Sequence, residues 1–325
     1  MHAIQYSGYG GGADALEHVE IPVPSLKNYE VLVKVEAASI NPADWKIQKG
    51  MLRPFLPKFP CIPVTDVAGE IVGLVLHCAA SKLFMSITKH RDNILQLHKG
   101  GGLAEYVAAL ESMTVTRPAG VSAADAAGLP ISGLTALQVL MFIGTKFDGT
   151  DNGANILVTA ASGGVGTYAV QLAKLGNHHV TATCGARNLD LVRSLGADEV
   201  LDYKTPEGAS LTSPSGRKYD YIINTTDTSS WAALKPSLSS HGRVIDVTPN
   251  PANYIASVLT VFSRKKITML TQVSLGKEQM RFLLDLVAEG KLRTVVDSRY
   301  PFEKAADAWK KSMSGHATGK VIVEM

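Results

Sequence analysis

Residues 156–176, ILVTAASGGVGTYAVQLAKLG, constrain the fold most because their pattern changes twice within a short distance. Residues 156–159 are apolar and mostly β-branched, the following residues up to Gly166 are small and glycine-rich, and apolar residues then recur at helical spacing. The pattern predicts a strand, a tight turn and a helix. Ala161, Gly163 and Gly166 occupy the three small positions of a dinucleotide-binding turn, and the first helical amides would face a pyrophosphate.

A glycine triplet alone also fits an ordinary tight connection, so the residues that follow decide the interpretation. A second β-branched run at residues 180–183 completes about one βαβ unit. Folds that bind NAD usually place an acid after this strand to hold the ribose hydroxyls. No acid occurs between Val180 and Asn188, and Arg187 stands there instead. A guanidinium suits a 2′-phosphate, so we expect NADPH, the alternative being a solvated surface arginine.

Composition describes an ordinary globular protein. The 325 residues suggest two domains, and 46% hydrophobic with 19% charged residues allows a sizeable core. A net charge of +3, with scattered Lys and Arg, gives no argument for nucleic acid. Cys61, Cys78 and Cys184 are odd in number and far apart, which fits a reducing compartment without a disulfide framework.

The sequence contains no recognisable targeting or membrane-spanning pattern. Strand-like alternation begins within the first residues, so we expect no cleaved targeting segment. The most apolar stretch, residues 71–87, is interrupted by His77, Ser81 and Lys82, and it is too short for a membrane span.

The order of patterns predicts a β-rich part, an alternating α/β part and a return to the first. Residues 30–38 alternate like a strand with one buried face, whereas an alanine-rich helical pattern begins at Ala123. Beyond residue 156 we expect a doubly wound sheet with later strands at 199–201, 219–223, 243–247 and 266–270. Two helices and two strands follow, at 277–289, 303–313, 293–297 and 320–324.

Six stretches together resemble the zinc-free quinone oxidoreductase branch of the medium-chain dehydrogenase/reductase superfamily. They are the opening strand with YGGG, NPADWKIQKG at 41–50, FPCIPVTDVAGEIV at 59–72, GLTALQ at 133–138, AASGGVG at 160–166 and ATGKVIVE at 317–324. The resemblance covers nearly the whole chain in the family's order. It implies an α/β protein with a GroES-like catalytic domain, residues 1–124 and 272–325, and a Rossmann NADPH-binding domain, residues 125–271.

The resemblance also implies function and partners. Members typically reduce α,β-unsaturated carbonyls or quinones with NADPH, and they are commonly dimeric. We therefore expect a small-molecule substrate, NADPH as cofactor and a homodimer. Plant members associated with the chloroplast envelope imply a peripheral location there, without a cleaved transit peptide, or a cytoplasmic one.

Site residues are carried over by position. The resemblance places Asn41, Asp44 and Lys46 on an active-site loop, Thr65 and Thr135 beside the nicotinamide, Ala161, Ser162, Gly163, Gly164, Val165 and Gly166 at the pyrophosphate, Arg187 and Tyr203 at the 2′-phosphate, and Asn224 and Thr248 at the same cleft. For the first three, composition alone favours a capped turn with a solvated lysine.

The predicted chemistry uses no metal. Zinc members of the superfamily have a cysteine where Asn41 stands, no histidine lies between Val19 and Val72, and the later histidines are irregularly spaced. Without a Lewis acid, an activated acceptor is easier to reduce than a simple ketone. Hydride addition to an enone places negative charge on the carbonyl oxygen, which Asn41 and Lys46 could stabilise. The proton could come from water or from a tyrosine, with Tyr6, Tyr9 and Tyr106 unranked.

Two other classes of protein remain open: an NADPH-binding protein with little turnover, and a peripheral membrane protein acting on lipid-derived ketones.

The segment at residues 74–99 departs from the family pattern. It contains no glycine, and Leu83, Ile87, Ile94 and Leu97 recur at helical spacing. We expect this segment to cost the catalytic barrel a strand pair and to lower stability and turnover, the alternative being a divergent loop that leaves the barrel intact.

Overall fold

The computed structural model describes residues 1–51, 53, 58–74, 84–87, 100–150, 153–248, 250–271 and 276–325. The chain forms two compact units. Unit 1 comprises residues 1–131 and 275–325, and unit 2 comprises residues 132–274.

Unit 2 is built on a parallel sheet of six strands in the order β10-β9-β8-β11-β12-β13. The strands are β8 (Asn155–Val158), β9 (His179–Cys184), β10 (Glu199–Asp202), β11 (Tyr219–Asn224), β12 (Leu238–Asp246) and β13 (Lys266–Met269). The chain winds outward from β8 in one direction and from β11 in the other. This order confirms the doubly wound fold, and it places the expected ligand crevice at the carboxyl ends of β8 and β11.

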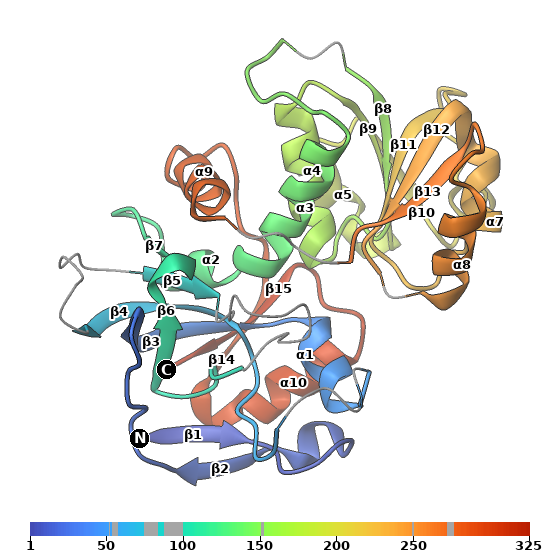
Figure 1. The fold of residues 1–325 in the computed structure, drawn as a ribbon. Coiled ribbons are helices and arrows are strands. Elements are labelled where there is room, and N and C mark those ends of the chain that lie inside the picture. The colour runs from blue at the N-terminus through green and yellow to red at the C-terminus, as the bar shows by residue number, and fades with distance from the viewer. Residues whose placement is uncertain are drawn as a thin grey trace. The chain divides into compact units, whose positions relative to one another are not determined.

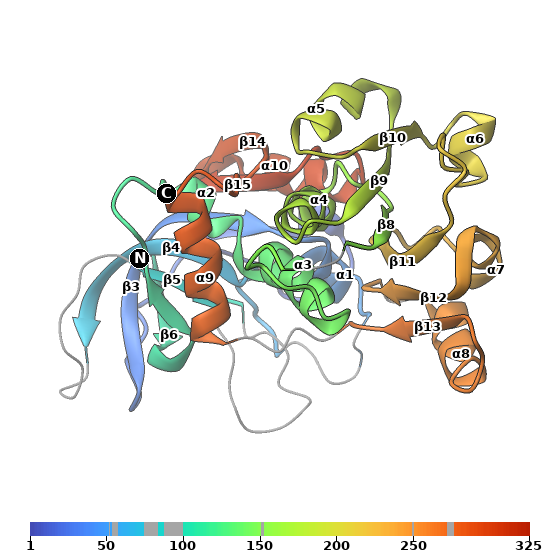
Figure 2. The ribbon, with the colours of Figure 1, turned by 90° about the horizontal axis from the view of Figure 1, so that it is seen from above.

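Helices lie on either side of this sheet, with α4 on one side and α7 and α8 on the other (Figures 1 and 2). Leu157, Ile222, Val244 and Ile267 form one row across four neighbouring strands, and their cluster packs on Leu234 of α7. The helices are α3 (Pro130–Phe142), which begins in unit 1, α4 (Gly164–Leu175), α5 (Leu189–Ser194), α6 (Pro206–Ala209), α7 (Trp231–Leu234) and α8 (Pro251–Leu259), with 3₁₀ turns η3 (Ala186–Asn188) and η4 (Lys235–Ser237).

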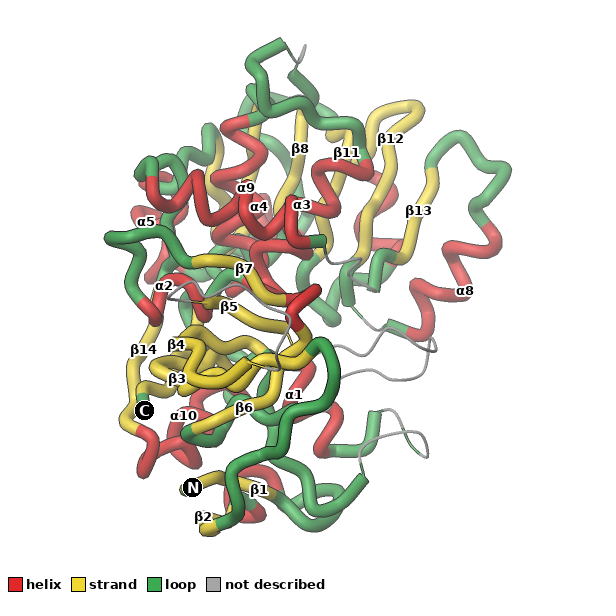
Figure 3. Tube along the Cα trace, turned by 60° about the vertical axis from the view of Figure 1, so that its left-hand side comes forward, coloured by secondary structure: helices red, strands yellow, loops and turns green. Residues whose placement is uncertain are grey.

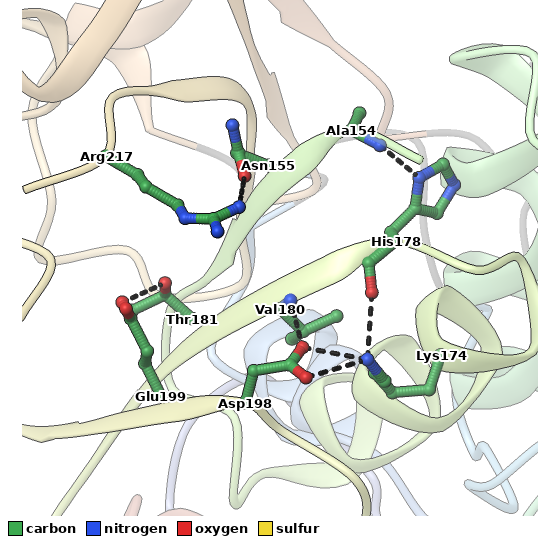
Figure 4. A network of polar contacts seen from close by, with 9 residues as sticks. All are labelled: Ala154, Asn155, Lys174, His178, Val180, Thr181, Asp198, Glu199 and Arg217. Carbon is green, nitrogen blue, oxygen red and sulfur yellow. Dashed lines mark hydrogen bonds and ion pairs between the residues drawn. The ribbon is translucent and has the colours of Figure 1, made fainter. Parts of the chain in front are cut away.

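Polar contacts join the amino ends of the strands, at the end of the sheet away from the glycine-rich turn (Figure 4). Lys174 of α4 donates to both carboxylate oxygens of Asp198, at 3.0 and 2.8 Å, and to the carbonyl oxygen of His178 at 3.0 Å. Asp198 also accepts the amide of Val180, and the Ala154 amide donates to Nδ1 of His178. These bonds fix the end of the sheet where the strands begin and leave the end where the strands finish for a ligand.

Unit 1 is built on a mixed sheet in the order β14-β15-β3-β4-β5-β7, with β6 pairing β3, and a separate pair β1-β2 (Figure 3). The strands are β1 (His2–Gln5), β2 (Glu17–Glu20), β3 (Glu30–Ile40), β4 (Asp66–Leu74), β5 (Phe84–Ile87), β6 (Tyr106–Leu110), β7 (Thr114–Thr116), β14 (Val296–Pro301) and β15 (Lys320–Glu324). Along β3, Val31, Val33 and Val35 are buried while Lys34 is exposed, which confirms the predicted alternation.

The two ends of the chain share the core of unit 1. Trp309 of α10 is fully buried against β3 residues such as Val33, and its indole N–H donates to Oε1 of Gln48, at the end of α1, at 3.1 Å. The helices of unit 1 are α1 (Pro42–Gln48), α2 (Ala123–Ala127), α9 (Lys277–Ala288) and α10 (Ala305–Met313), with 3₁₀ turns η1 (Gly12–Ala15), η2 (Glu111–Met113) and η5 (Phe302–Lys304).

Two local expectations require correction. The strand predicted at 293–297 runs instead from Val296 to Pro301, where β15 supplies its hydrogen-bond partners. Within the atypical segment, Phe84–Ile87 forms β5 between β4 and β7, so the inference of helical structure from residue spacing is wrong for these four residues. Pairing with neighbouring strands overrides a weak local periodicity. Most of the segment, residues 75–83 and 88–99, lies outside the described residues.

Candidate active site and cofactor-binding residues

The turn between β8 and α4 is shaped by the close approach of Gly166 to the preceding strand. A Cβ at Gly166 would lie 2.4 Å from the carbonyl oxygen of Ala160 and 2.7 Å from Cα of Ala161. The Ala161 amide is held by the carbonyl oxygen of Thr183, at 2.8 Å. Ser162, Gly163, Gly164 and Val165 are partly exposed, and the first turn of α4 has neither an acidic residue nor a side-chain cap. A pyrophosphate fits this helix start.

Two cationic side chains follow the carboxyl ends of β9 and β10. Arg187 is exposed on η3, and Tyr203, half exposed after β10, has its amide held by the carbonyl oxygen of Cys184 at 3.1 Å. The ammonium of Lys204 lies 5.8 Å from the centroid of the Tyr203 ring. Lys204 is therefore a cation that sequence reasoning missed, while Asp202 beside it accepts the Lys204 amide at 3.0 Å.

The other predicted cofactor residues in unit 2 are engaged by neighbours at the carboxyl edge. Oδ1 of Asn224 accepts the Thr159 hydroxyl at 2.9 Å. The amide and hydroxyl of Thr248 both donate to Oδ1 of Asp246, at 2.8 and 2.7 Å. Thr135 is buried in α3. These bonds fix the ends of β8, β11 and β12, where the doubly wound fold places its ligand.

Unit 1 contains a cluster of buried charges around Asn41. The Lys320 ammonium donates to Oδ1 of Asn41 at 2.6 Å and lies 4.0 Å from Oδ2 of Asp66. Nδ2 of the Asn41 side chain donates to the same Asp66 oxygen at 2.9 Å, and the backbone N–H of Asn41 donates to Oδ2 of Asp44 at 2.7 Å. None of the four residues is more than 6% exposed. We call Asn41, Asp44, Asp66 and Lys320 the buried polar cluster.

Burial dominates the electrostatics of this cluster. It raises the pKa of Asp44 to about 7 and that of Asp66 to about 6, although the Lys320 charge opposes both shifts. Burial likewise lowers the pKa of Lys320, against the attraction of the two carboxylates. Tyr6 and Cys61 face Asp44 from outside the cluster, and burial raises the pKa of each. One ammonium between two carboxyls favours keeping one proton on the pair.

The hydrogen bonds of Asn41 argue against its predicted role as a donor to the substrate. Its Nδ2 already donates to the Asp66 carboxylate and to the carbonyl oxygen of Ser39, at 2.9 and 3.2 Å. Both amide hydrogens are thus used inside unit 1. Lys46 is partly exposed on α1, with its ammonium 5.6 Å from the centroid of the Trp45 ring. The Thr65 hydroxyl is buried and has no partner among the described residues.

The three candidate tyrosines differ in surroundings. Tyr6 is fully buried and stays protonated, because burial raises its pKa well above the usual range. The Tyr9 ring packs edge-on against Phe59 at 4.8 Å and lies 3.9 Å from the guanidinium of Arg53. Tyr106 is partly buried in β6.

Two kinds of feature are absent from the described part of the chain. It holds no group of three or more His, Cys, Asp or Glu side chains placed to bind a metal ion. Among the same residues, no helix has the length and apolar character needed to cross a membrane.

A doubly wound nucleotide-binding sheet joined to a β-rich unit with a buried polar cluster defines a two-domain dehydrogenase/reductase. Residues 27–119 match the alcohol dehydrogenase GroES-like domain and residues 195–323 match the zinc-binding dehydrogenase family. The chloroplast envelope quinone oxidoreductase homolog of Arabidopsis thaliana is 56% identical over 332 residues, covering 100% of this chain and 98% of that protein.

More distant relatives extend this picture. The NADPH-dependent alkenal/one oxidoreductase of Arabidopsis thaliana chloroplasts is 32% identical over 337 residues, covering 99% of this chain and 79% of that protein. The quinone oxidoreductase of Thermus thermophilus, solved also with NADPH, has a TM-score of 0.79 and 26% identity, covering 100% of both chains. The chain belongs to the quinone oxidoreductase homologues of the medium-chain dehydrogenase/reductase superfamily and is an oxidoreductase with a nicotinamide-cofactor fold.

Proposed function

We propose that this protein uses NADPH to reduce the carbon–carbon double bond conjugated to a carbonyl, or a quinone, without a metal ion. The observation that carries the proposal is the turn between β8 and α4, where only a glycine fits at position 166 and the start of α4 has no side-chain cap. Arg187 and Lys204 supply two cations for a 2′-phosphate. Names of relatives support the substrate class, since they include quinone and alkenal/one oxidoreductases.

The cofactor, when bound, would supply a hydride to the β-carbon of the acceptor. The electron pair of the double bond then moves toward the carbonyl oxygen, which needs a donor. We assign that role to Lys46 and the unpartnered hydroxyl of Thr65, in place of Asn41. The α-carbon must then gain one proton. Asp44, whose pKa is about 7, retains a proton on a substantial fraction of molecules at neutral pH and is the proposed source.

Steady-state assays with NADPH test the proposal against enals, enones, γ-ketols and quinones. We expect consumption of NADPH with at least one acceptor, and a saturated carbonyl or a hydroquinone as product. Thr65→Val should lower kcat by about tenfold or more, as expected when one charge-stabilising donor is lost. A matched exposed control is Thr116→Val in β7, which should change nothing. NADPH binding without turnover of any acceptor would favour the alternative of an NADPH-binding protein with little turnover.

A homodimer through the outer edge of unit 2 is part of the same proposal. Strand β13 is at the end of its sheet, so one side of its backbone has no strand partner among the described residues. Beside it, α8 and the turn that follows expose six apolar side chains: Tyr254, Ile255, Val258, Leu259, Val261 and Phe262. A second copy would cover this surface and pair with the edge. Light scattering should give twice the chain mass, and Leu259→Asp should give the monomer, unlike Val23→Asp on unit 1.

Localisation at the chloroplast envelope, or in the cytoplasm, also remains a proposal. The envelope name of the Arabidopsis relative supports the first. Flotation with liposomes of envelope lipids, carried out on wild type and Leu259→Asp, separates peripheral membrane binding from a freely soluble dimer. Wild-type protein that stays at the bottom of the gradient would contradict membrane association.

A further inference from the structure

The register of three strands brings Lys320, Asn41, Ser39 and Asp66 to one face of the sheet in unit 1. Ser39 of β3 lies opposite Asp66 of β4 and opposite Ile322 of β15. Residues directly opposite each other share a face, and so do residues two apart along a strand. Asn41 continues β3 in extended conformation, and Lys320 starts β15, so all four side chains lie on the face occupied by Ser39.

The contacts close a triangle on this face. Lys320 donates to the oxygen of the Asn41 amide at 2.6 Å, the nitrogen of that amide donates to Asp66 at 2.9 Å, and Lys320 lies 4.0 Å from the same Asp66 oxygen. Each end of the Asn41 side chain is therefore held by a buried charge. Asp66 also accepts the amide of Ile131 at 3.2 Å.

Helix α1 starts from this triangle. Asn41 precedes its first residue, and the backbone N–H of Asn41 donates to the side chain of Asp44 in the first turn of α1. Lys46 stands two residues further along. The placement of both proposed reactive side chains thus depends on where Asn41 is held.

We propose that Lys320 and Asp66 are positioning residues, which orient the side-chain amide of Asn41 and thereby hold α1 with Asp44 and Lys46 in place for reduction of the acceptor. This inference rests on the proposed function. It assigns no contact with substrate to Lys320 or Asp66; they act through Asn41.

Stability alone does not account for this arrangement. A buried ion pair is often no more stable than apolar residues of the same volume. Here, moreover, Oδ1 of Asp66 and the hydroxyls of Ser39 and Thr65 are buried without a hydrogen-bond partner among the described residues, which adds a cost. Such a costly set of polar groups at the start of α1 is expected where orientation matters more than stability.

The test compares Lys320→Met with Lys304→Met, which replaces an exposed lysine of the same unit. Lys320→Met leaves the Asn41 oxygen without its cation and Asp66 without its counter-charge. We expect faster hydrogen exchange in α1, kcat lowered by about tenfold or more, and a Kd for NADPH within about twofold of wild type, since the proposed cofactor residues other than Thr65 lie in unit 2. Lys304→Met should match wild type in all three.

The double variant Lys320→Met/Asp66→Asn distinguishes positioning from a purely structural role. Removing both charges relieves the uncompensated buried carboxylate but still leaves the Asn41 side-chain oxygen without its Lys320 donor, so the melting temperature should recover toward wild type while α1 exchange stays fast and kcat stays lowered by about tenfold. Asp66→Asn alone, which is isosteric, serves if Lys320→Met does not fold, and it should lose kcat with an unchanged Kd for NADPH.

Unchanged α1 exchange in Lys320→Met, or in Asp66→Asn if the former does not fold, would overturn the inference. So would a double variant in which α1 exchange and kcat return to within about threefold of wild type. If wild-type protein turns over no acceptor, the proposed function fails, but the exchange measurements still decide whether these residues hold α1.

Discussion

Replacing Asp44 with asparagine should stabilise unit 1 at neutral pH, although it alters a buried residue of the proposed site. Asp44→Asn keeps an oxygen that can accept the hydrogen bond from the backbone N–H of Asn41, which the carboxylate now accepts at 2.7 Å. The substitution also removes a carboxyl group whose ionised form burial disfavours. The remaining ion pair, Lys320 with Asp66, is then balanced in charge.

The magnitude follows from the pKa of Asp44, which rises from 3.8 to about 7 on folding. Each pKa unit corresponds to about 1.4 kcal/mol, so ionising Asp44 costs the folded state at most about 4 kcal/mol. Between these two pKa values the folded state binds more protons than the unfolded state, so stability falls as pH rises. The loss is absent below about pH 4 and complete above about pH 7. Asp66, whose pKa is raised to about 6, contributes in the same direction between about pH 4 and 6.

Tryptophan fluorescence can isolate unit 1. Trp45 and Trp309 lie in unit 1 and Trp231 in unit 2, so denaturant unfolding in a Trp231→Phe background reports unit 1. Asp44→Asn should unfold at about the same denaturant concentration as its parent at pH 4, and be more stable by about 1 to 4 kcal/mol at pH 8. The exposed Asp285→Asn of α9 is the control, with an expected change within about 0.5 kcal/mol. Equal destabilisation at both pH values, or a parent that gains stability from pH 4 to 7, would refute the reasoning.

Three further outcomes are expected. Arg187→Ala should weaken NADPH binding by about ten- to a hundredfold and NADH binding far less, because it removes a charge-assisted contact to the 2′-phosphate; equal weakening of both, measured by fluorescence titration, would remove the NADPH assignment. Gly166→Ala should destabilise unit 2 by about 1 to 3 kcal/mol and weaken both cofactors, since its Cβ meets Ala160 at 2.4 Å; unchanged melting and affinity would show that the turn can shift. Elemental analysis should find no stoichiometric zinc, and activity that a chelator abolishes and zinc restores would contradict the metal-free mechanism.

The cofactor unit could be predicted in some detail because its signals are local. The run from Ile156 through Gly176 encodes strand, turn and helix within one short stretch. In unit 1, the alternation of Val31, Val33 and Val35 marks β3 in the same local way. These patterns depend on near neighbours in sequence. The strand order then follows from the doubly wound connection.

The buried polar cluster could not be found in the same way. Asp66 and Lys320 both lie in stretches that resemble the family, yet Lys320 stands 279 positions along the chain from Asn41, and only strand pairing joins them. A lysine at the first position of a strand is usually solvated, so the burial of Lys320 could not be predicted from its place in the sequence. The assignment of Asn41 as an enolate donor likewise overlooked that neighbouring charges would use its amide. Lys204 was missed because the arginine one strand away already explained the phosphate.

Transfer of a deuteride tests the central claim most directly. NADPH labelled with deuterium at C4 of the nicotinamide, on the face that the protein uses, is incubated with an enone that the wild-type protein consumes, and the product is analysed by mass spectrometry and NMR. We expect a saturated ketone with deuterium on the β-carbon and ordinary hydrogen from water on the α-carbon. An allylic alcohol with deuterium on the former carbonyl carbon would contradict it.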